Sequence, residues 1–234
     1  MQVLTLFTVI PVKKLDNGKT RLSPLLSKDE RKELSLRMLH DVLKTVSATH
    51  AVNECVIISS DQEALNTAKT VGLTPLREPS PMGINEAVQY ANSFCIDHGA
   101  TSTLVLPADI PLITQEDIDN MVDASKPEPS VIIIPSARQD GTNALLRRPP
   151  EIIATSYDRA SYQTHLCYAS DKQIRFTVLH PETVMLDIDL PQDLETFLKR
   201  RSSTETYSYL SRLEPALNER HLRHNTSSGR GSSI

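Results

Sequence analysis

Aspartates stand at two places where the chain is expected to leave a strand. Asp109 follows the apolar run 103–106 and lies between two prolines, which stiffen its turn. Asp187 and Asp189 alternate at the end of another short apolar run, so both side chains fall on one face of a strand. Carboxylates placed in this way can hold Mg²⁺ against substrate phosphates. The alternatives are a turn aspartate bonded to its own backbone and, for Asp189, a cap on the next helix.

A basic stretch follows the first apolar run of the chain. It contains Lys13, Lys14, Lys19 and Arg21. Lysine supplies a point charge and arginine a bidentate fork, so the stretch predicts a cradle for a polyphosphate. A solvated basic loop is the alternative, and charge alone favours it.

Two polar segments are weaker candidates for an anion site. In the first, Gly141 is followed by Thr142 and Asn143, whose side chains suit a phosphate or carboxylate, although the pattern also fits a hairpin turn. The second is the polar helix start at Ser161, which can bind an anion through its backbone N–H groups. His165, one turn later, is more often a structural residue.

The elements that must position these residues alternate between strand and helix. Several predicted strands are apolar throughout, which is typical of a mainly parallel sheet covered on both faces. Ligands of such sheets bind beyond the carboxyl ends of the strands, where the candidates above lie. The first predicted strand ends at Pro11. The others span residues 55–59, 73–76, 103–106, 131–134, 143–147, 175–179 and 184–186. The predicted helices include residues 83–98, 161–170 and 191–198.

Composition limits the remaining possibilities. The 234 residues carry a net charge of −4 and only 4% aromatic side chains, which argues against nucleic-acid binding. The three widely spaced cysteines predict neither a zinc site nor a disulfide framework, and fit a reducing cytosol. We find no signal-peptide pattern and no run long enough to span a bilayer, so we expect a cytoplasmic protein with no membrane partner.

Glycine is scarce, at 7 residues, and neither GxGxxG nor a P-loop pattern occurs. We divide the chain into a domain over 1–201 and a C-terminal tail over 202–234, partly helical or disordered. Within the tail, 207–224 is either an ordered helix, which would make a homodimer plausible, or a mobile segment, and its final Ser/Gly-rich residues are predicted to be disordered.

Taken together and in order, these segments resemble the 2-phospho-L-lactate guanylyltransferase family, which acts in the biosynthesis of coenzyme F-420. The resemblance covers about residues 3–200. It is carried by Lys13, Gly18–Pro24, Gly83–Ala87, Ala108–Leu112, Gly141–Leu145, Ser161 with His165, and Asp187–Asp189 with Pro191 and Asp193.

The resemblance implies an α/β fold of the nucleotide-diphospho-sugar transferase (glycosyltransferase-A-like) type, a three-layer α/β/α sandwich with a mostly parallel mixed sheet. It implies transfer of a guanylyl group from GTP to 2-phospho-L-lactate or phosphoenolpyruvate, with release of pyrophosphate. By motif, each implied role falls on particular residues: Lys13, Lys19 and Arg21 with Asp109 in catalysis at the phosphates; Gly83 and Asn85, with Lys19 and Arg21, for the nucleotide; Thr142 and Ser161 for the phosphoacid; and Asp109, Asp187 and Asp189 for Mg²⁺.

One position departs from the family pattern. Family members commonly have a glycine two or three residues before the serine of the phosphoacid loop, where this chain has Asp158 and Arg159. A backbone contact would then be lost, and Arg159 would supply a charge instead. Alternatives are therefore an acceptor such as 3-phosphoglycerate or a sugar phosphate and, from another class, a non-catalytic nucleotide-binding module. A non-catalytic module would be expected to lack Asp109 or the pair Asp187 and Asp189, and this chain has all three.

Overall fold

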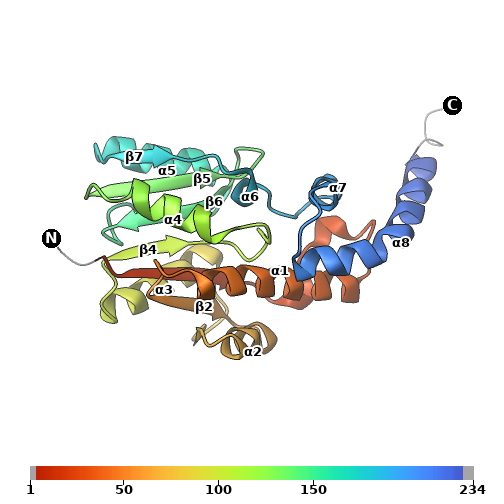
Figure 1. Ribbon diagram of the computed structural model, residues 1–234, viewed down its shortest axis with the longest axis horizontal. Helices are drawn as coiled ribbons and strands as arrows, with labels where there is room; N and C mark the ends of the chain where they lie inside the picture. Colours follow the sequence, from red (N-terminus) through yellow and green to blue (C-terminus); the bar gives the residue numbers. More distant parts are fainter. Residues whose placement is uncertain (1–3, 229–234) are drawn as a thin grey trace.

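The computed structural model describes residues 4–228 and contains one mixed sheet (Figure 1). Its strand order is β3-β2-β1-β4-β6-β5-β7, and β6 alone runs antiparallel to its neighbours. The strands are β1 (Leu6–Val12), β2 (Glu54–Ser59), β3 (Thr74–Arg77), β4 (Ser102–Val105), β5 (Ser130–Pro135), β6 (Thr142–Arg148) and β7 (Phe176–Val178).

Helices connect the parallel strands, and several begin at a side chain that caps the first turn. Ser27 and Glu30 form a capping box at the start of α1, and the side chain of Asp61 accepts hydrogen bonds from the first turn of α2. The helices are α1 (Lys28–Ala48), α2 (Gln62–Thr70), α3 (Ile84–Asp97), α4 (Gln115–Ala124), α5 (Ser161–Asp171), α6 (Glu182–Met185), α7 (Pro191–Lys199) and α8 (Glu205–Ser228).

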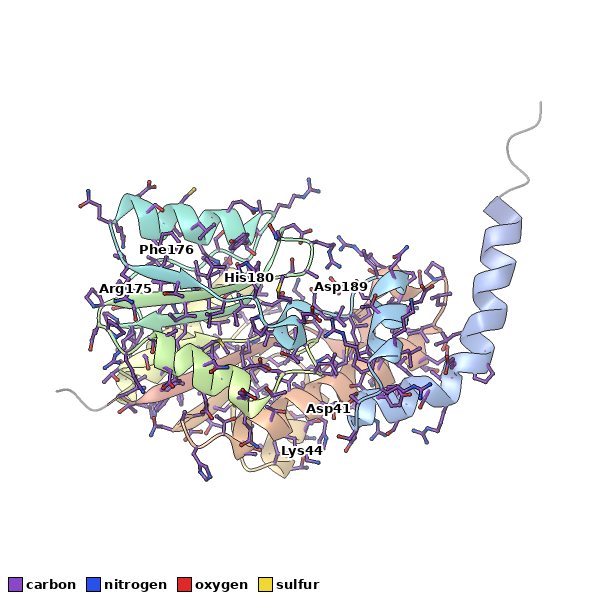
Figure 2. The ribbon with its side chains drawn as sticks, turned by 45° about the horizontal axis from the view of Figure 1, so that its top comes forward. Asp41, Lys44, Arg175, Phe176, His180 and Asp189 are labelled. Atoms are coloured by element: carbon purple, nitrogen blue, oxygen red, sulfur yellow. The ribbon has the colours of Figure 1, made fainter. Side chains whose placement is uncertain are left out.

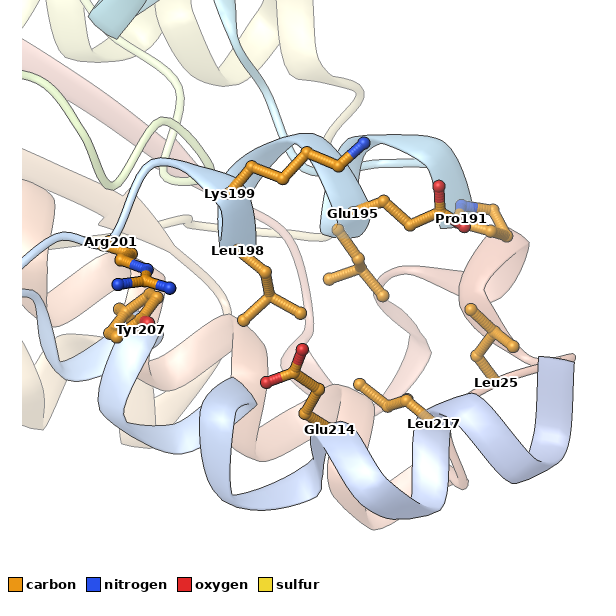
Figure 3. Close-up of a pocket in the computed structure, with 10 residues that line it drawn as sticks. Leu25, Pro191, Glu195, Leu198, Lys199, Arg201, Tyr207, Glu214 and Leu217 are labelled. Atoms are coloured by element: carbon orange, nitrogen blue, oxygen red, sulfur yellow. The ribbon is translucent and has the colours of Figure 1, made fainter.

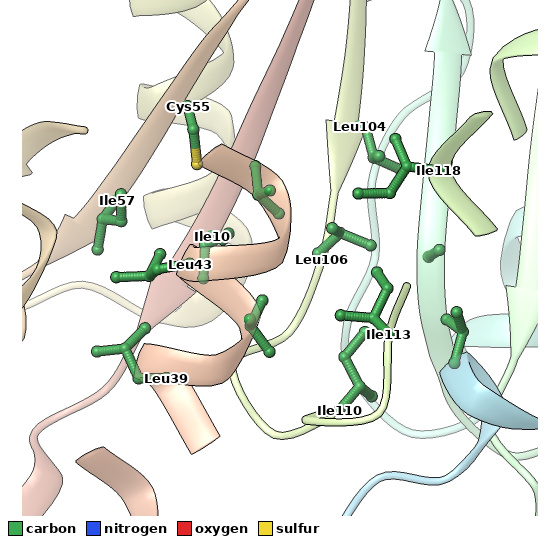
Figure 4. Packing of buried hydrophobic residues seen from close by; sticks show 14 of the residues in the cluster. Ile10, Leu39, Leu43, Cys55, Ile57, Leu104, Leu106, Ile110, Ile113 and Ile118 are labelled. Carbon is green, nitrogen blue, oxygen red and sulfur yellow. The ribbon is translucent and has the colours of Figure 1, made fainter. Parts of the chain in front are cut away.

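Alternate residues of the strands enter two cores on opposite faces of the sheet. On one face, side chains such as Ile10, Ile57 and Leu104 pack against α1, α2 and α4 (Figure 4). On the other face, the strands pack against α3 and α5. The arrangement is a three-layer α/β/α sandwich, as the resemblance implied.

The reversed strand β6 decides which residues share an edge. Because β6 is antiparallel, its first residue, Thr142, pairs with Pro135, the last residue of β5. The start of β6 therefore lies at the edge where β1, β4 and β5 end, and Thr142 reaches the same edge as the residues that follow those strands.

Helix α8 packs on α1 rather than on the sheet. Its start is held by Asp41 of α1, whose carboxylate accepts hydrogen bonds from the backbone N–H groups of Glu205 and Thr206 and from the Thr206 hydroxyl (Figure 2). Leu210 and Leu217 are buried in the core that α1, α7 and α8 share. The final residues of the predicted tail, 229–234, lie outside the described part of the chain. Within 4–228, no helix is apolar over a length sufficient to cross a bilayer.

One predicted strand is wrong. Residues 184–186 were expected to form a strand, but Glu182–Met185 form the short helix α6 after Pro181. An apolar run of three residues has no periodicity that separates strand from helix. The choice is made by tertiary contacts: Val184 is buried under the sheet, and the amide of Asn143 donates to the carbonyl oxygens of Val184 and Met185.

Candidate functional site

A cavity of about 450 Å³ opens at the carboxyl ends of β1 and β4. It brings together four of the predicted site residues, Lys13, Lys19, Asp109 and Asp189. Its remaining lining comes from Pro11, Val12, Lys14, Leu15, Gly18, Ser35, Met38, Ile84, Pro107 and Ala108. Ile84 is the first residue of α3, so Gly83, which caps that helix, lies at the border of the cavity.

Lys19 lies between two of the predicted carboxylates. Its Nζ donates to Oδ2 of Asp109 at 2.5 Å and to Oδ1 of Asp189 at 2.6 Å. Arg21 is exposed and approaches the other oxygen of Asp189 at 3.9 Å. Lys19 itself has a backbone φ of 54°, in the left-handed region that side chains other than glycine seldom adopt. The loop therefore holds a strained backbone to place this ammonium group.

The charges at this site shift each other's pKa values. Burial alone would lower the pKa of Lys19, but the charges of Asp109 and Asp189 outweigh it and raise that pKa above its usual value. Burial would raise the pKa of Asp189, and Lys19 reverses the sign and lowers it. Lys19 is therefore cationic and Asp189 anionic at neutral pH.

Asp187 connects this cavity to the start of β6. Its Oδ1 accepts from the amide of Asn143 at 3.1 Å, and its Oδ2 accepts from Arg138 at 2.8 Å. Burial and the charge of Asp109 raise the pKa of the Asp187 carboxyl. The backbone also brings the two residues close together, because the N–H of Ile188, which follows Asp187, donates to the carbonyl oxygen of Asp109 at 3.0 Å.

Thr142 and Ser161, the two residues predicted to bind the phosphoacid, lie in contact with each other. The Ser161 hydroxyl donates to Oγ1 of Thr142 at 3.4 Å, and Nδ1 of His165 lies 2.9 Å from the same oxygen. Thr142, Ser161 and His165 are all buried. A polar cluster therefore stands beside Asp187, since Thr142 directly precedes Asn143.

Asn85 lies apart from the cavity lining. Its Oδ1 accepts from the backbone N–H of Tyr157 at 2.6 Å, and its Nδ2 donates to Asp158 at 2.9 Å. The side chain thus joins the start of α3 to the loop before α5. Asp158 and Arg159, which stand where the family commonly has glycine, are exposed.

The carboxylates fit a magnesium ion that is held partly by substrate. Oδ1 of Asp109 is buried and has no hydrogen-bond partner among the described residues. The pKa of the Asp187 carboxyl is raised, which means that its negative charge is poorly compensated at this site. In the described residues 4–228, no three Asp, Glu, His or Cys side chains converge closely enough to enclose a metal by themselves. Mg²⁺ is commonly held by one or two carboxylates together with substrate phosphates, so this donor set suits it.

Sequence reasoning missed two arginines with long-range contacts, and the first of them reaches the site. Arg138 donates to both Asp187 and Asp193. It could have been found from the sequence, because it is a charged residue that follows the predicted strand 131–134 closely. Arg147 is buried inside β6 and donates to Asn92, Thr103 and the carbonyl of Ile153. No motif points to Arg147, because it sits within an apolar strand pattern.

A second, larger cavity of about 870 Å³ lies between α7 and α8 (Figure 3). Its walls include Leu194, Leu198 and Leu217, with Glu195 and Glu214 among its charged residues. None of the predicted site residues lines it.

The sequence is similar throughout to that of one enzyme family. The profile of the family described as "Guanylyl transferase CofC like" matches residues 6–228. A phosphoenolpyruvate guanylyltransferase of Sphaerobacter thermophilus is 33% identical over 82% of this chain and 92% of its own length. A 2-phospho-L-lactate guanylyltransferase of Methanobrevibacter smithii is 35% identical over 89% of this chain and 91% of its own length.

Solved structures show the same fold. A nucleotide-diphospho-sugar transferase structure from Desulfovibrio desulfuricans has a TM-score of 0.75 at 17% identity, covering 93% of this chain and 99% of that one. A cytidylyltransferase from Leptospira borgpetersenii has a TM-score of 0.60 at 17% identity and covers 99% of both chains. At these identities the likeness concerns the fold, which confirms the predicted fold class.

Proposed function

The chain belongs to the CofC-like guanylyl transferase family, and from that premise we propose that it joins the guanylyl group of GTP to 2-phospho-L-lactate or phosphoenolpyruvate. Membership makes it an enzyme of the nucleotidyltransferase type, in a family associated with coenzyme F-420 biosynthesis. The acid, the metal and the residue roles below are the content of the proposal.

The donor nucleotide is assigned to the cavity at the ends of β1 and β4. Lys13, Lys14 and Lys19 line it and Arg21 approaches Asp189 on its wall, and all four stand on the loop that leaves β1. Lys19 and Arg21 would bind the triphosphate, with Lys13 beside them. Gly83 and Asn85, at the start of α3, would border the base and ribose.

The acceptor acid is assigned to the polar cluster at the start of β6. Thr142 and Ser161 offer hydroxyl groups there, and Asp187 stands between this cluster and the donor cavity. An acid phosphate at the cluster and a nucleotide α-phosphate at the cavity would therefore meet near Asp187.

In the proposed reaction, a phosphate oxygen of the acid attacks the α-phosphorus of GTP, and the bond to the β-phosphate oxygen breaks as pyrophosphate leaves. The nucleophile is already an anion, so no general base is required. The obstacle is repulsion between two anions, and Lys19 and Arg21 offset it while they orient the triphosphate. Asp109 and Asp187, with Asp189 close by, would hold Mg²⁺, which when bound neutralises phosphate charge.

The observation that carries this proposal is the position of Asp187: its carboxylate contacts Asn143 on the acceptor side, and the backbone N–H of the next residue, Ile188, donates to the carbonyl oxygen of Asp109 on the donor side. The test is a matrix of four nucleoside triphosphates against 2-phospho-L-lactate, phosphoenolpyruvate and 3-phosphoglycerate, with and without Mg²⁺, scored by pyrophosphate release. We expect release with GTP and one of the first two acids, dependent on Mg²⁺. Release only with 3-phosphoglycerate, or only with another nucleotide, would refute it.

A homodimer in the cytoplasm completes the proposal. The position of α8 supports the dimer, because this helix extends away from the sheet and offers a surface to a second copy of the chain (Figure 1). Sedimentation at several protein concentrations tests it, and a single species of monomer mass throughout would contradict it.

A further inference from the structure

His165 is buried completely and uses both of its ring nitrogens. Nε2 accepts a hydrogen bond from the backbone N–H of Ser156 at 3.0 Å. A neutral imidazole carries one proton, so Nδ1 is the protonated nitrogen and donates to Oγ1 of Thr142 at 2.9 Å. Burial and the charge of the nearby Arg147 lower the pKa of His165 to about 4, which keeps the ring neutral at physiological pH.

The Thr142 hydroxyl therefore receives two hydrogen bonds, one from His165 and one from Ser161. A hydroxyl oxygen has two lone pairs and one proton, so both acceptor positions are filled. What remains is its own O–H, for which no acceptor stands among the described residues. Such a group suits an oxygen with no proton of its own, as in a phosphate or carboxylate.

We propose that His165 is a positioning residue, which fixes the Thr142 hydroxyl as a donor toward the anionic oxygens of the acceptor acid. This inference rests on the proposed function, which places the acid at Thr142. The competing explanation is purely structural: through its bond to Ser156, His165 would only anchor the loop before α5.

A double-mutant cycle separates these explanations. His165→Leu and Thr142→Val should each raise the KM for the acid by about tenfold or more, since the second variant removes the hydroxyl that donates to the charged acid and the first leaves that hydroxyl without its fixed orientation. The KM for GTP should not change. In the double variant, the KM should equal that of Thr142→Val, because His165 has no hydroxyl left to orient. Losses that multiply in the double variant would overturn the inference.

Two further variants keep the test decisive if His165→Leu does not fold. The amide of His165→Asn reaches the position of Nδ1 and can donate to Thr142, whereas that of His165→Gln reaches the position of Nε2 and can accept from Ser156. We expect the Asn variant to keep the lower KM for the acid and the Gln variant to lose it. The reverse order would show that anchoring Ser156 is the role. Absence of transfer to any acid by the wild-type chain would refute the proposed function instead.

Discussion

Nζ of Lys19 lies 2.5 Å from Oδ2 of Asp109, so a cation already stands against a carboxylate that is proposed to bind a metal. The same ammonium lies 2.6 Å from Asp189. In the absence of ligands, Lys19 thus neutralises the carboxylates that would otherwise repel one another. On the proposed function, the phosphates of a bound nucleotide would offer this ammonium a second set of partners.

Lys19→Met should change metal binding and turnover in opposite directions. Without the ammonium, Asp109 and Asp189 are uncompensated, so the nucleotide-free chain should bind Mn²⁺, used as a probe for Mg²⁺, about tenfold more tightly. Pyrophosphate release should fall, because the triphosphate loses a cation. Electron paramagnetic resonance measures the Mn²⁺ affinity, with the exposed Lys69→Met as the matched control. An affinity equal to that of the wild type would contradict the arrangement.

Asp109→Asn should remove activity while the fold remains. The substitution keeps the size of the side chain, but it removes the negative charge and replaces one of the two carboxylate oxygens with an NH2 group, which does not bind a metal ion. We expect turnover to fall by roughly 10²-fold or more, a magnitude typical of a lost electrostatic contact to the reacting group. Pyrophosphate release and the melting temperature measure the two effects, and the exposed Asp97→Asn serves as control. Near-normal release would show that Asp109 does not take part.

The stability of the protein should decrease in acid because of His165. Its pKa is lowered from 6.5 to about 4 in the folded chain, so protonation favours the unfolded chain. The contribution is complete above pH 6.5 and is lost as the pH falls toward 4, which amounts to about 3 kcal/mol. Urea unfolding at pH 7 and pH 4 should show a drop larger by about this amount in the wild type than in His165→Asn. If the free energy of unfolding falls equally in both proteins, protonation of His165 is not the cause of the acid sensitivity.

Asp158 should weaken binding of the acid through its charge. It is exposed beside the loop that carries Ser161, so repulsion of an anion is screened and amounts to a few-fold in affinity. We expect Asp158→Asn to lower the KM for the acid about two- to fivefold. Asp171→Asn, at the other end of α5, is the control. If only Asp158→Gly lowers the KM, the backbone rather than the charge is responsible.

Asp41→Ala should loosen α8. The carboxylate accepts three hydrogen bonds from Glu205 and Thr206, and its loss leaves the N–H groups at the start of the helix without partners. We expect the free energy of unfolding to fall by about 2 kcal/mol or more. Urea titration measures it, with the exposed Asp119→Ala on α4 as the control. A loss as small as that of the control would mean that solvent replaces these bonds.

The layers and most elements were predictable because local patterns encode them. The capping box at Ser27 and the apolar strands are local signals, and the structure confirms them. The direction of β6 was not predictable, since an isolated strand pattern does not say which neighbour it pairs with. The prediction of a strand at 184–186 was wrong for another reason, since an apolar run of three residues has no period that separates strand from helix.

Among the candidate site residues, the ones that follow strands were found by position alone. Lys13, Asp109 and Asp187 are examples, and the structure brings Lys13 and Asp109 into one cavity. Whether these residues act as proposed is for the variants above to decide. The contacts of Arg138 and Arg147 were missed because they join segments far apart in the chain, which no spacing reveals.

On the proposed assignment, the reversal of β6 also separates the sites of the two substrates along the chain. The donor cavity is built mainly from the loops after β1 and β4, whereas the turn at 136–141 leads directly into Thr142. Insertions or deletions in that turn would change the surroundings of Thr142, at the proposed acceptor site, and leave the loops after β1 and β4 in register. The fold thus allows a change of acceptor by altering a single connection, with the nucleotide half inherited intact.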